Sequence, residues 1–238
     1  MKPLFSILTR LLVISLWLPG LIHAQTTMNR EAELGILLAS GNTEEENLNF
    51  AGAINIVQER WVYDFSLAGL YASTNGEVNG QRITAIASTN YEVTNYSFIQ
   101  SRVSHEDDRF SGFDSQSDLT FSYGHEYLRN RDNMRFTPSI GAGVRYSRLE
   151  DSTTETEPIL RLAGEYEWNI SETSNFFQDL SLEAGSEADI YRSRTGIETN
   201  ILDNLSLRFT LTIKHQTTVP VDREETDTQT SVTFVMNF

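Results

Sequence analysis

The sequence predicts an all-β protein, a transmembrane up-and-down antiparallel β-barrel of about 12 strands. The predicted strands run for about ten to fourteen residues, which suits a tilted strand crossing a bilayer and exceeds the length usual in soluble sheets. Aromatic rings gather toward strand ends, where membrane barrels carry two girdles. The final run alternates without interruption, and its apolar face closes on the last residue: Val232, Phe234, Met236 and Phe238.

A soluble barrel of the lipocalin type is the alternative, because alternation alone does not say whether the apolar face looks inward or outward. Strand length, the two girdles and the terminal Phe238 favour the outward direction. We therefore expect the apolar faces to contact lipid and the polar faces to line a lumen.

The first residues resemble a secretory signal peptide. Lys2 and Arg10 flank an apolar stretch at 11–18, which is followed by Pro19 and by Ala24. This pattern predicts a signal peptide over 1–24. Its apolar core is too short to span about 30 Å of hydrocarbon, so an anchoring helix is the weaker alternative. No Pro-rich or Ser-rich linker divides the rest, and 25–238 is predicted to be one outer-membrane β-barrel domain.

Alternation along the mature chain places the strands in order. They are predicted at residues 31–39, 47–57, 61–72, 82–94, 96–105, 115–128, 134–148, 159–170, 176–186, 191–201, 205–216 and 227–238. An even number of strands puts both termini on one side of the membrane, which we expect to be the periplasm.

The connections alternate between two kinds, as in outer-membrane barrels with short periplasmic turns and longer external loops. The tight ones are predicted at 58–60, 94–95, 129–133, 171–174 and 202–204. The others are mostly longer and acidic, and they are predicted at 40–46, 73–81, 106–114, 150–158, 187–190 and 217–226.

The eleventh predicted strand gives the clearest register. Its apolar residues, Leu205 to Ile213 at every second position, point to lipid, and Arg208 and Lys214 point into the lumen. A slip by one residue would move Arg208 into hydrocarbon at about 2 to 4 kcal/mol. The fifth strand has no cleanly apolar face, so a bulge near Gln100 or an edge of the lumen opening is expected there, and Arg102 is expected to line the pore.

The same rule predicts a lumen of two characters. The first half is small and mostly neutral: Asn47, Asn49, Ala51, Ala53, Asn55, Ser66, Ala68, Thr84, Ser88 and Asn90. The second half is charged in mixed sign: Arg135, Arg145, Arg161, Glu165, Glu167, Glu183, Arg192, Arg194, Glu198, Arg208 and Lys214. Such a cluster can filter solutes or can plug the lumen with ion pairs. Balanced pairs favour the plug.

Charge and composition exclude several functions. The net charge is −15, and removal of the signal peptide takes away two basic residues and no acidic one, which gives −17 and excludes nucleic acid as a partner. The absence of cysteine excludes thiol chemistry. No motif for a cofactor or a dedicated metal site is found. The acidic loops could bind divalent cations weakly, but we expect mainly a solvated acidic rim.

Catalysis by a Ser and a His on the outer wall is the alternative to a passive role. The mature chain has three histidines, His105, His125 and His215. Ser104 adjoins His105, but neighbouring strand residues face opposite sides and cannot form a nucleophile–base pair. We therefore expect no enzyme, with an outer-leaflet lipid-modifying enzyme as the alternative.

Two motifs carry a resemblance to a known family. They are Ser40-Gly41-Asn42-Thr43 after the first strand, and Glu225-Thr226-Asp227-Thr228 leading into Val232, Phe234 and Phe238. The mature chain resembles the YdiY-like salt-induced outer membrane protein family, also called domain of unknown function 481. The resemblance implies an outer-membrane barrel of Gram-negative bacteria without an established activity, and the family name suggests a response to salt.

The sequence thus predicts a passive role. We expect a narrow pore for ions or small solutes, or an envelope-stabilising protein linked to salt or osmotic stress. The expected partners are outer-membrane lipid, lipopolysaccharide and the barrel-assembly machinery, which would recognise the C-terminal strand. We expect a monomer. An adhesin or receptor is a third alternative, but loops of about ten residues or fewer offer little surface for a specific partner.

Overall fold

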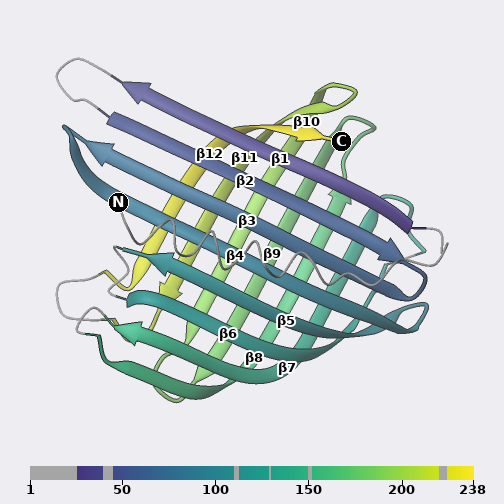
Figure 1. Cartoon of the computed structure of the whole chain (residues 1–238). Coiled ribbons are helices and arrows are strands. Elements are labelled where there is room, and N and C mark those ends of the chain that lie inside the picture. The colour runs from purple at the N-terminus through teal and green to yellow at the C-terminus, as the bar shows by residue number, and fades with distance from the viewer. Residues whose placement is uncertain (1–25, 40–44, 110–112, 129, 150–151, 220–223) are drawn as a thin grey trace.

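A computed structural model describes residues 26–39, 45–109, 113–128, 130–149, 152–219 and 224–238. Over these residues twelve antiparallel strands follow one another in up-and-down order and close into a barrel (Figure 1). The strands are β1 (Thr26–Ala39), β2 (Glu45–Gln58), β3 (Trp61–Thr74), β4 (Glu77–Thr94), β5 (Ser97–Asp108), β6 (Phe113–His125), β7 (Met134–Leu149), β8 (Thr154–Asn169), β9 (Ser174–Gly185), β10 (Ile190–Leu202), β11 (Leu205–Gln216) and β12 (Thr226–Asn237). The predicted fold class is confirmed. The predicted signal peptide lies outside the described residues.

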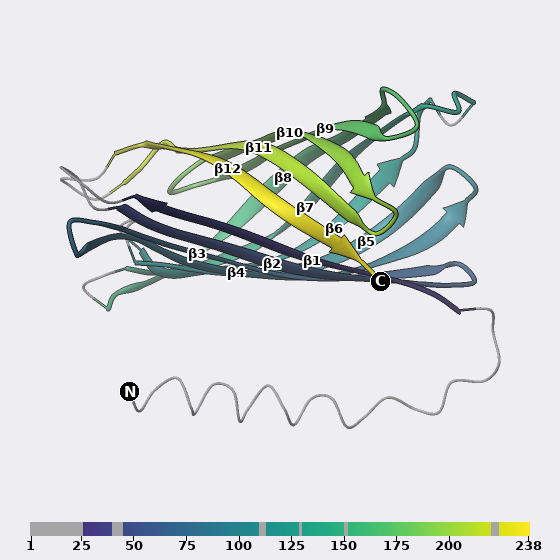
Figure 2. The ribbon, with the colours of Figure 1, turned by 90° about the horizontal axis from the view of Figure 1, so that it is seen from above.

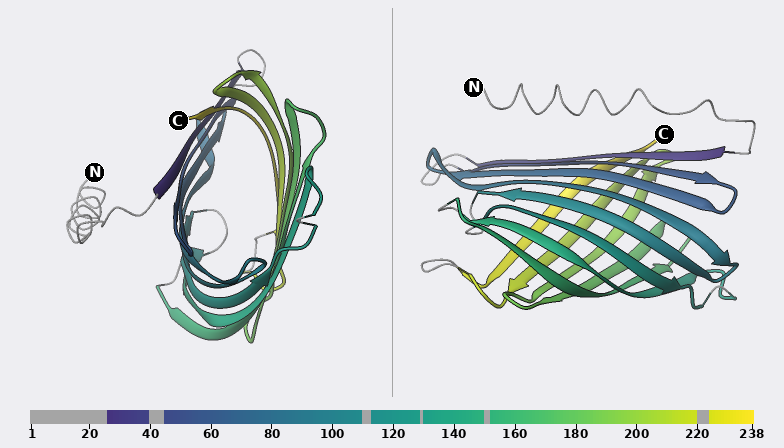
Figure 3. Two further views of the ribbon diagram at one scale, coloured as in Figure 1. Left: turned by 90° about the vertical axis from the view of Figure 1, so that its right-hand side faces the viewer. Right: turned by 60° about the horizontal axis from the view of Figure 1, so that its bottom comes forward.

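The barrel is flattened. Seen from above, β1 to β4 form one wall and β9 to β12 form the wall that faces it, with the strands of the two walls crossing (Figure 2). An end-on view shows an oval cross-section (Figure 3). Inner side chains of opposite walls can therefore meet across the short axis, which a round barrel of the same strand number would prevent.

The two ends of the barrel differ. At one end β1 ends at Ala39 and β2 begins at Glu45, and the connections 75–76 and 186–189 join β3 to β4 and β9 to β10; we call it the loop end. The other end carries 59–60, 95–96, 126–128, 130–133, 170–173 and 203–204 together with both termini of the described chain, and we call it the turn end.

The prediction of a long loop over 73–81 is wrong. β3 and β4 continue to Thr74 and from Glu77, and only two residues connect them. Asn75 and Gly76 have φ angles of 52° and 80°, the left-handed conformation that a two-residue type I′ hairpin requires. This turn chemistry is present in the sequence as Asn-Gly, but polar residues on both sides obscured it.

Other predicted acidic loops are also partly strand. Glu106 and Asp108 belong to β5, and Glu157 belongs to β8. Each faces inward and meets a basic side chain, so its charge does not require solvent. The expected bulge near Gln100 is absent: the ladder of β5 is irregular at Glu92/Thr94 on one side and at Glu106/Asp108 on the other.

Burial in this molecule is inverted relative to a soluble domain. Large apolar side chains lie on the outer surface; Phe121 is 57% exposed and Phe234 is 56% exposed. The side chains buried in the interior are mostly polar, among them Arg145, Glu183 and Thr233. This is the distribution expected when lipid covers the outer face. Within the described residues there is no helix long and apolar enough to cross a membrane.

Candidate functional site

The structure places all of the predicted charged lumen residues on the inner face of the barrel. Arg161 lies opposite Glu183 in the ladder between β8 and β9, and Arg135 lies opposite Glu167 between β7 and β8. The predicted neutral residues of β2 to β4 share the same inner face. Three groups of inner charges are described in turn; outside them, Arg135 pairs with Glu167, and Arg194 lies 3.1 Å from Asp179.

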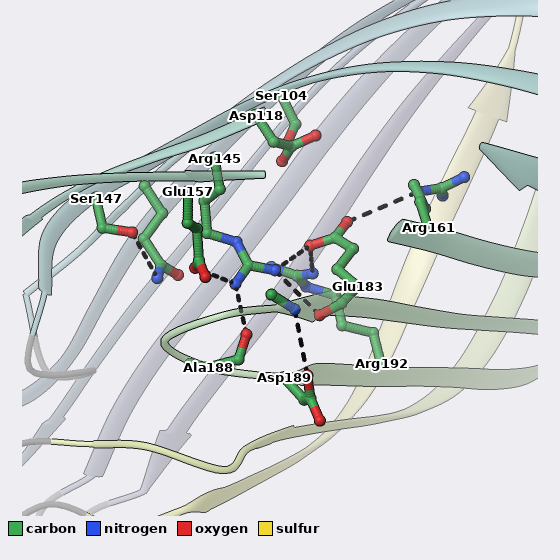
Figure 4. A network of polar contacts seen from close by, with 12 residues as sticks. Ser104, Asp118, Arg145, Ser147, Glu157, Arg161, Glu183, Ala188, Asp189 and Arg192 are labelled. Atoms are coloured by element: carbon green, nitrogen blue, oxygen red, sulfur yellow. Dashed lines mark hydrogen bonds and ion pairs between the residues drawn. The ribbon is translucent and has the colours of Figure 1, made fainter. Parts of the chain in front are cut away.

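The first group, the Glu183 cluster, centres on Glu183, whose side chain is 2% exposed. Its carboxylate lies 2.9 Å from Nη1 of Arg192, 3.3 Å from Nη2 of Arg145 and 3.7 Å from Nε of Arg161 (Figure 4). Nη1 of Arg102, on β5, is 4.0 Å from the same carboxylate. One buried carboxylate therefore serves guanidinium groups from β5, β7, β8 and β10.

Arg145 is the most enclosed of these cations, with a side chain 2% exposed. It donates from Nη1 to Glu157 at 3.0 Å and to the backbone carbonyl of Ala188 at 2.9 Å. Burying a charge is costly unless partners replace its water, and here carboxylates and a carbonyl do so. These contacts fill the lumen on the β7 to β10 side near the loop end.

Arg102 on the fifth strand also points inward, as the sequence predicts. Its Nη1 lies 2.6 Å from Oδ1 of Asp118 on β6, and the other oxygen of Asp118 accepts from Ser104. A cavity of about 130 Å³ remains between these groups and the Glu183 cluster. This space is enough for a few water molecules rather than for a solute.

The second group consists of ion pairs that span the lumen. Arg82 on β4 lies 3.2 Å from Asp227 on β12, and it also lies 2.5 Å from Asp108 on the neighbouring strand β5. Lys214 on β11 is paired with Glu106 on β5. Both bridges lie near the loop end and hold the flattened barrel together across its short axis.

The third group, the seam cluster, lies where β1 meets β12. Arg208 on β11 reaches 2.5 Å to Glu198 on β10, 2.8 Å to Glu31 and 2.9 Å to Glu33 on β1. Glu33 also accepts from Thr233 of β12. Polar contacts across the seam thus join the first strand to the last three.

The turn-end half of the lumen has an excess of acid. Between the two rims its basic inner residues are Arg135, Arg194 and Arg208, against the acidic residues Glu31, Glu33, Asp64, Glu165, Glu167, Asp179 and Glu198. The loop-end half is balanced, with Arg82, Arg102, Arg145, Arg161, Arg192 and Lys214 against Glu106, Asp108, Asp118, Glu157, Glu183 and Asp227. Among the described residues no group of three His, Asp or Glu side chains could hold a metal ion.

The opposite side of the lumen is hollow. A cavity of about 550 Å³ lies between β1 to β5 and β12, and its inner-face lining includes Asn47, Asn49, Leu70 and Gln229. Toward the turn end the small inner side chains Ser66 and Ala68 are exposed. In its loop-end half the lumen is therefore divided into a filled side and a hollow side.

Sequence reasoning missed several inner charges: Glu31, Glu33, Asp64, Arg82, Glu106, Asp108, Asp118, Glu157 and Asp179. Three of them, Glu106, Asp108 and Glu157, lie in strand ends that were predicted as loops, and the other six lie within the predicted strands. Period two was the available signal, because Glu157 continues the inner series of Arg161 and Glu106 continues that of Arg102.

Each described histidine pairs with a hydroxyl on the outer wall. His105 Nδ1 lies 2.8 Å from Ser117 Oγ, His125 Nδ1 lies 2.7 Å from Ser97 Oγ, and His215 Nδ1 lies 2.9 Å from Thr226 Oγ1. All three pairs are directly cross-strand. The neighbour Ser104, by contrast, faces inward and binds Asp118, as alternation predicts.

Known structures share this fold. The translocator domain of the autotransporter NalP from Neisseria meningitidis matches with a TM-score of 0.51 at 10% identity, covering 98% of this chain and 94% of that one. An outer membrane channel from Pseudomonas putida F1 gives a TM-score of 0.49 at 12% identity, with 92% and 97% covered. The first likeness supports an outer-membrane type of β-barrel.

Sequence comparison is more specific. "Uncharacterized protein YdiY" from Escherichia coli (strain K12) is 25% identical over 199 residues, which are 83% of this chain and 78% of that protein. The family model described as "Protein of unknown function, DUF481" matches residues 32–238, from the first strand to the last residue. The predicted resemblance is confirmed, and the chain belongs to the DUF481 family of outer-membrane type β-barrels.

Proposed function

We propose that this protein is a narrow passive pore of the outer membrane, which conducts small cations and small uncharged solutes along the hollow side of its lumen. The observation that carries the proposal is the division of the loop-end half of the lumen into a filled side and a hollow side. Ion pairs fill the side of β7 to β10, whereas a cavity of about 550 Å³ lies beside β1 to β4. A barrel needing only stability would have no reason to leave one side empty.

The inner side chains of the hollow side support a path for solutes. Asn47 and Asn49 line the cavity near the loop end, and the exposed Ser66 and Ala68 continue toward the turn end. They are small and uncharged, so a solute would lose little hydration against them. The passage would be much narrower than that of a porin of 16 to 18 strands.

The charge distribution supports a preference for cations. The turn-end half has more acidic than basic inner residues, and Glu165 is exposed to the lumen there. Rings and clusters of carboxylates favour cations in channels. The loop-end half is balanced and contributes little to the sign of selectivity.

The orientation is part of the proposal. Both described termini lie at the turn end, whose connections include the two-residue turns 59–60 and 203–204. Outer-membrane barrels of bacteria carry short turns in the periplasm and longer loops outside. The loop end would therefore face the exterior, and both termini the periplasm.

Planar-bilayer conductance tests the pore. The refolded mature protein, 25–238, is expected to give discrete steps, with a reversal potential of cationic sign in a KCl gradient. Ala68→Trp places an indole in the hollow side and should reduce the conductance several-fold. Ala87→Trp is the matched control, because Ala87 lies on the outer face of neighbouring β4 and should leave conductance unchanged.

A silent bilayer would reject the pore, provided that heat-modifiable migration on gels confirms folding. The remaining function would then be an envelope-stabilising barrel held by the Glu183 cluster and the bridges between its walls. Equal conductance of the Ala68→Trp variant and the parent would place any path elsewhere in the lumen.

One observation favours a second candidate, hydrolysis of outer-leaflet lipid. Ser117 and His105 form a hydroxyl–imidazole pair on the outer wall, toward the loop end of β5 and β6. A hydrolase would need an acidic or amide group to orient the imidazole, and none is hydrogen-bonded to it within the described residues. Release of fatty acid from phospholipid vesicles that Ser117→Ala abolishes would establish this activity.

A further inference from the structure

The ladder that closes the barrel is short. β1 and β12 pair only from Glu31 opposite Asn237 to Leu34 opposite Phe234. β12 itself pairs with β11 along its whole length, from Thr226 to Met236. Its residues 226–231 therefore have a paired strand on one side only among the described residues.

Beyond Gly35 the two strands separate. A Cβ on Gly35 would lie 2.7 Å from Cγ2 of Thr233 and 2.9 Å from the carbonyl oxygen of Val232, so the strands are still in contact there. Toward the loop end β1 and β12 then diverge as the two sides of a wedge (Figure 2). The barrel wall is incomplete in its loop-end half.

The hollow cavity lies at this wedge. It is lined by Gly35 and by the consecutive residues 228–232 of β12 as well as by β2, β3 and β4. Consecutive residues of one strand line a cavity when the cavity meets the edge of the strand rather than its face. The lumen therefore reaches the unpaired edge of β12.

An unpaired strand edge cannot face hydrocarbon, because each unsatisfied backbone group costs several kcal/mol there. Such an edge is tolerated where it lines a water-filled cavity. The wedge therefore brings the water of the lumen and the lipid of the membrane together at the side of the barrel. A molecule with one polar and one apolar part suits such a boundary.

We propose that the wedge between β1 and β12 is a side portal, through which an amphiphile with an uncharged polar head enters the lumen from the membrane. Amide side chains would hold the head: Asn49 accepts from Gln229 across the cavity at 3.0 Å, and Asn47 lies beside them. Leu70 and the lipid-facing Val232 would contact the tail. A volume of about 550 Å³ is within the range of sites that enclose small molecules.

The charges beside the cavity exclude an anionic head. Arg82 is the cation there, and it is already held by Asp108 and Asp227. Two carboxylates against one guanidinium leave a negative surplus, which repels phosphate. A strand of a partner protein is a poorer occupant. A strand added to the edge of β12 could not also pair with the diverging β1, so its own second edge would be left unsatisfied at the membrane.

Fluorescence quenching can test the portal on the whole mature protein, which has no cysteine of its own. A bimane is attached at Ser231→Cys, on the inner face of β12 beside the wedge. Ala68→Cys, on the inner face of β3 away from the seam, is the matched control, and Thr230→Cys reports the outer face. The quenchers are iodide in the water and phosphatidylcholine with brominated acyl chains in the vesicle.

If the wedge is a portal, bimane at position 231 is quenched by both iodide and the brominated lipid. Bimane at position 68 is then quenched by iodide alone, and bimane at position 230 mainly by the brominated lipid. Octyl glucoside below its micellar concentration should protect Ser231 several-fold from bromine, and dodecyl phosphate should not. Quenching of Ser231 by iodide alone, or equal bromine quenching at Ala68, would overturn the portal. Protection by both amphiphiles alike would overturn the uncharged head. These readouts do not depend on conductance, so the portal can fail while the pore stands.

Discussion

Nη2 of Arg82 lies 3.2 Å from Oδ2 of Asp227, although 145 residues separate them in the chain. β4 and β12 are not neighbours in the sheet, so this contact spans the lumen. It can form only because the barrel is flattened. The ion pair between Lys214 on β11 and Glu106 on β5 likewise joins two strands that are not neighbours in the sheet. Contacts of this kind explain how a barrel with a short closing ladder keeps its shape.

The bridge between Lys214 and Glu106 should be important for stability. The two side chains are 6% and 13% exposed, so Lys214→Met leaves a largely buried carboxylate without its ammonium partner. We expect a loss of about 3 to 5 kcal/mol in the free energy of unfolding, measured by urea titration in lipid vesicles. The double variant Lys214→Met/Glu106→Gln should recover part of that loss. A double variant no more stable than Lys214→Met would contradict the pairing.

Arg145 and Arg148 on β7 allow a buried and an exposed arginine of the same strand to be compared. Arg145 is 2% exposed and lies within the Glu183 cluster, whereas Arg148 is 52% exposed and lies 3.5 Å from Asp114. Arg145→Met should destabilise the barrel by about 3 to 5 kcal/mol, because it removes the cation that lies between the buried carboxylates of Glu157 and Glu183. Arg148→Met should cost about 1 kcal/mol or less. Equal losses in urea titrations would show that the cluster is no more important than a surface pair.

The fold could be predicted from the sequence because each strand repeats one local rule. In β11, for example, the inner residues Ser206, Arg208, Thr210 and Lys214 are buried, whereas the outer residues Leu207 and Phe209 are exposed. The lipid-facing direction was predicted from strand length, from the aromatic residues toward strand ends and from Phe238. Such information is local, so a single sequence contains it.

The contacts of the lumen could be predicted only in part. Alternation says that Arg208 faces inward, but it cannot say that the partners of Arg208 are Glu31 and Glu33, 175 or more residues away. Those pairings depend on the flattening of the barrel and on how β1 meets β12. The prediction of some strand ends was wrong for a different reason. Glu106 and Glu157 are predicted to lie in solvated loops, because the sequence does not show which basic side chains pair with them in the fold.

Cation preference should depend on the acidic turn-end half of the lumen. Asp64 accepts from Asn55 at 2.7 Å and lies on β3, and Glu165 is exposed on β8. The double variant Asp64→Asn/Glu165→Gln removes two negative charges without changing side-chain size. We expect the reversal potential in a KCl gradient to move toward zero. Glu172→Gln, in the exposed connection 170–173, is the control and should leave the potential unchanged. An unchanged potential in the double variant would contradict the assigned path.

Closure of the barrel should be sensitive at Gly35. A Cβ at this position would lie 2.7 Å from Cγ2 of Thr233 and 2.9 Å from the carbonyl oxygen of Val232, so Gly35→Val must push β12 away where the closing ladder ends. Gly52→Val is the matched control in the adjacent strand, because its Cβ would meet only the carbonyl oxygen of Glu31 at 3.8 Å, an ordinary contact. We expect Gly35→Val to lower the fraction that folds into vesicles several-fold, measured by heat-modifiable migration on gels, and Gly52→Val to fold like the parent. If both variants folded alike, the strands could not approach each other at Gly35 as closely as the structure places them, and the wedge would begin nearer the turn end.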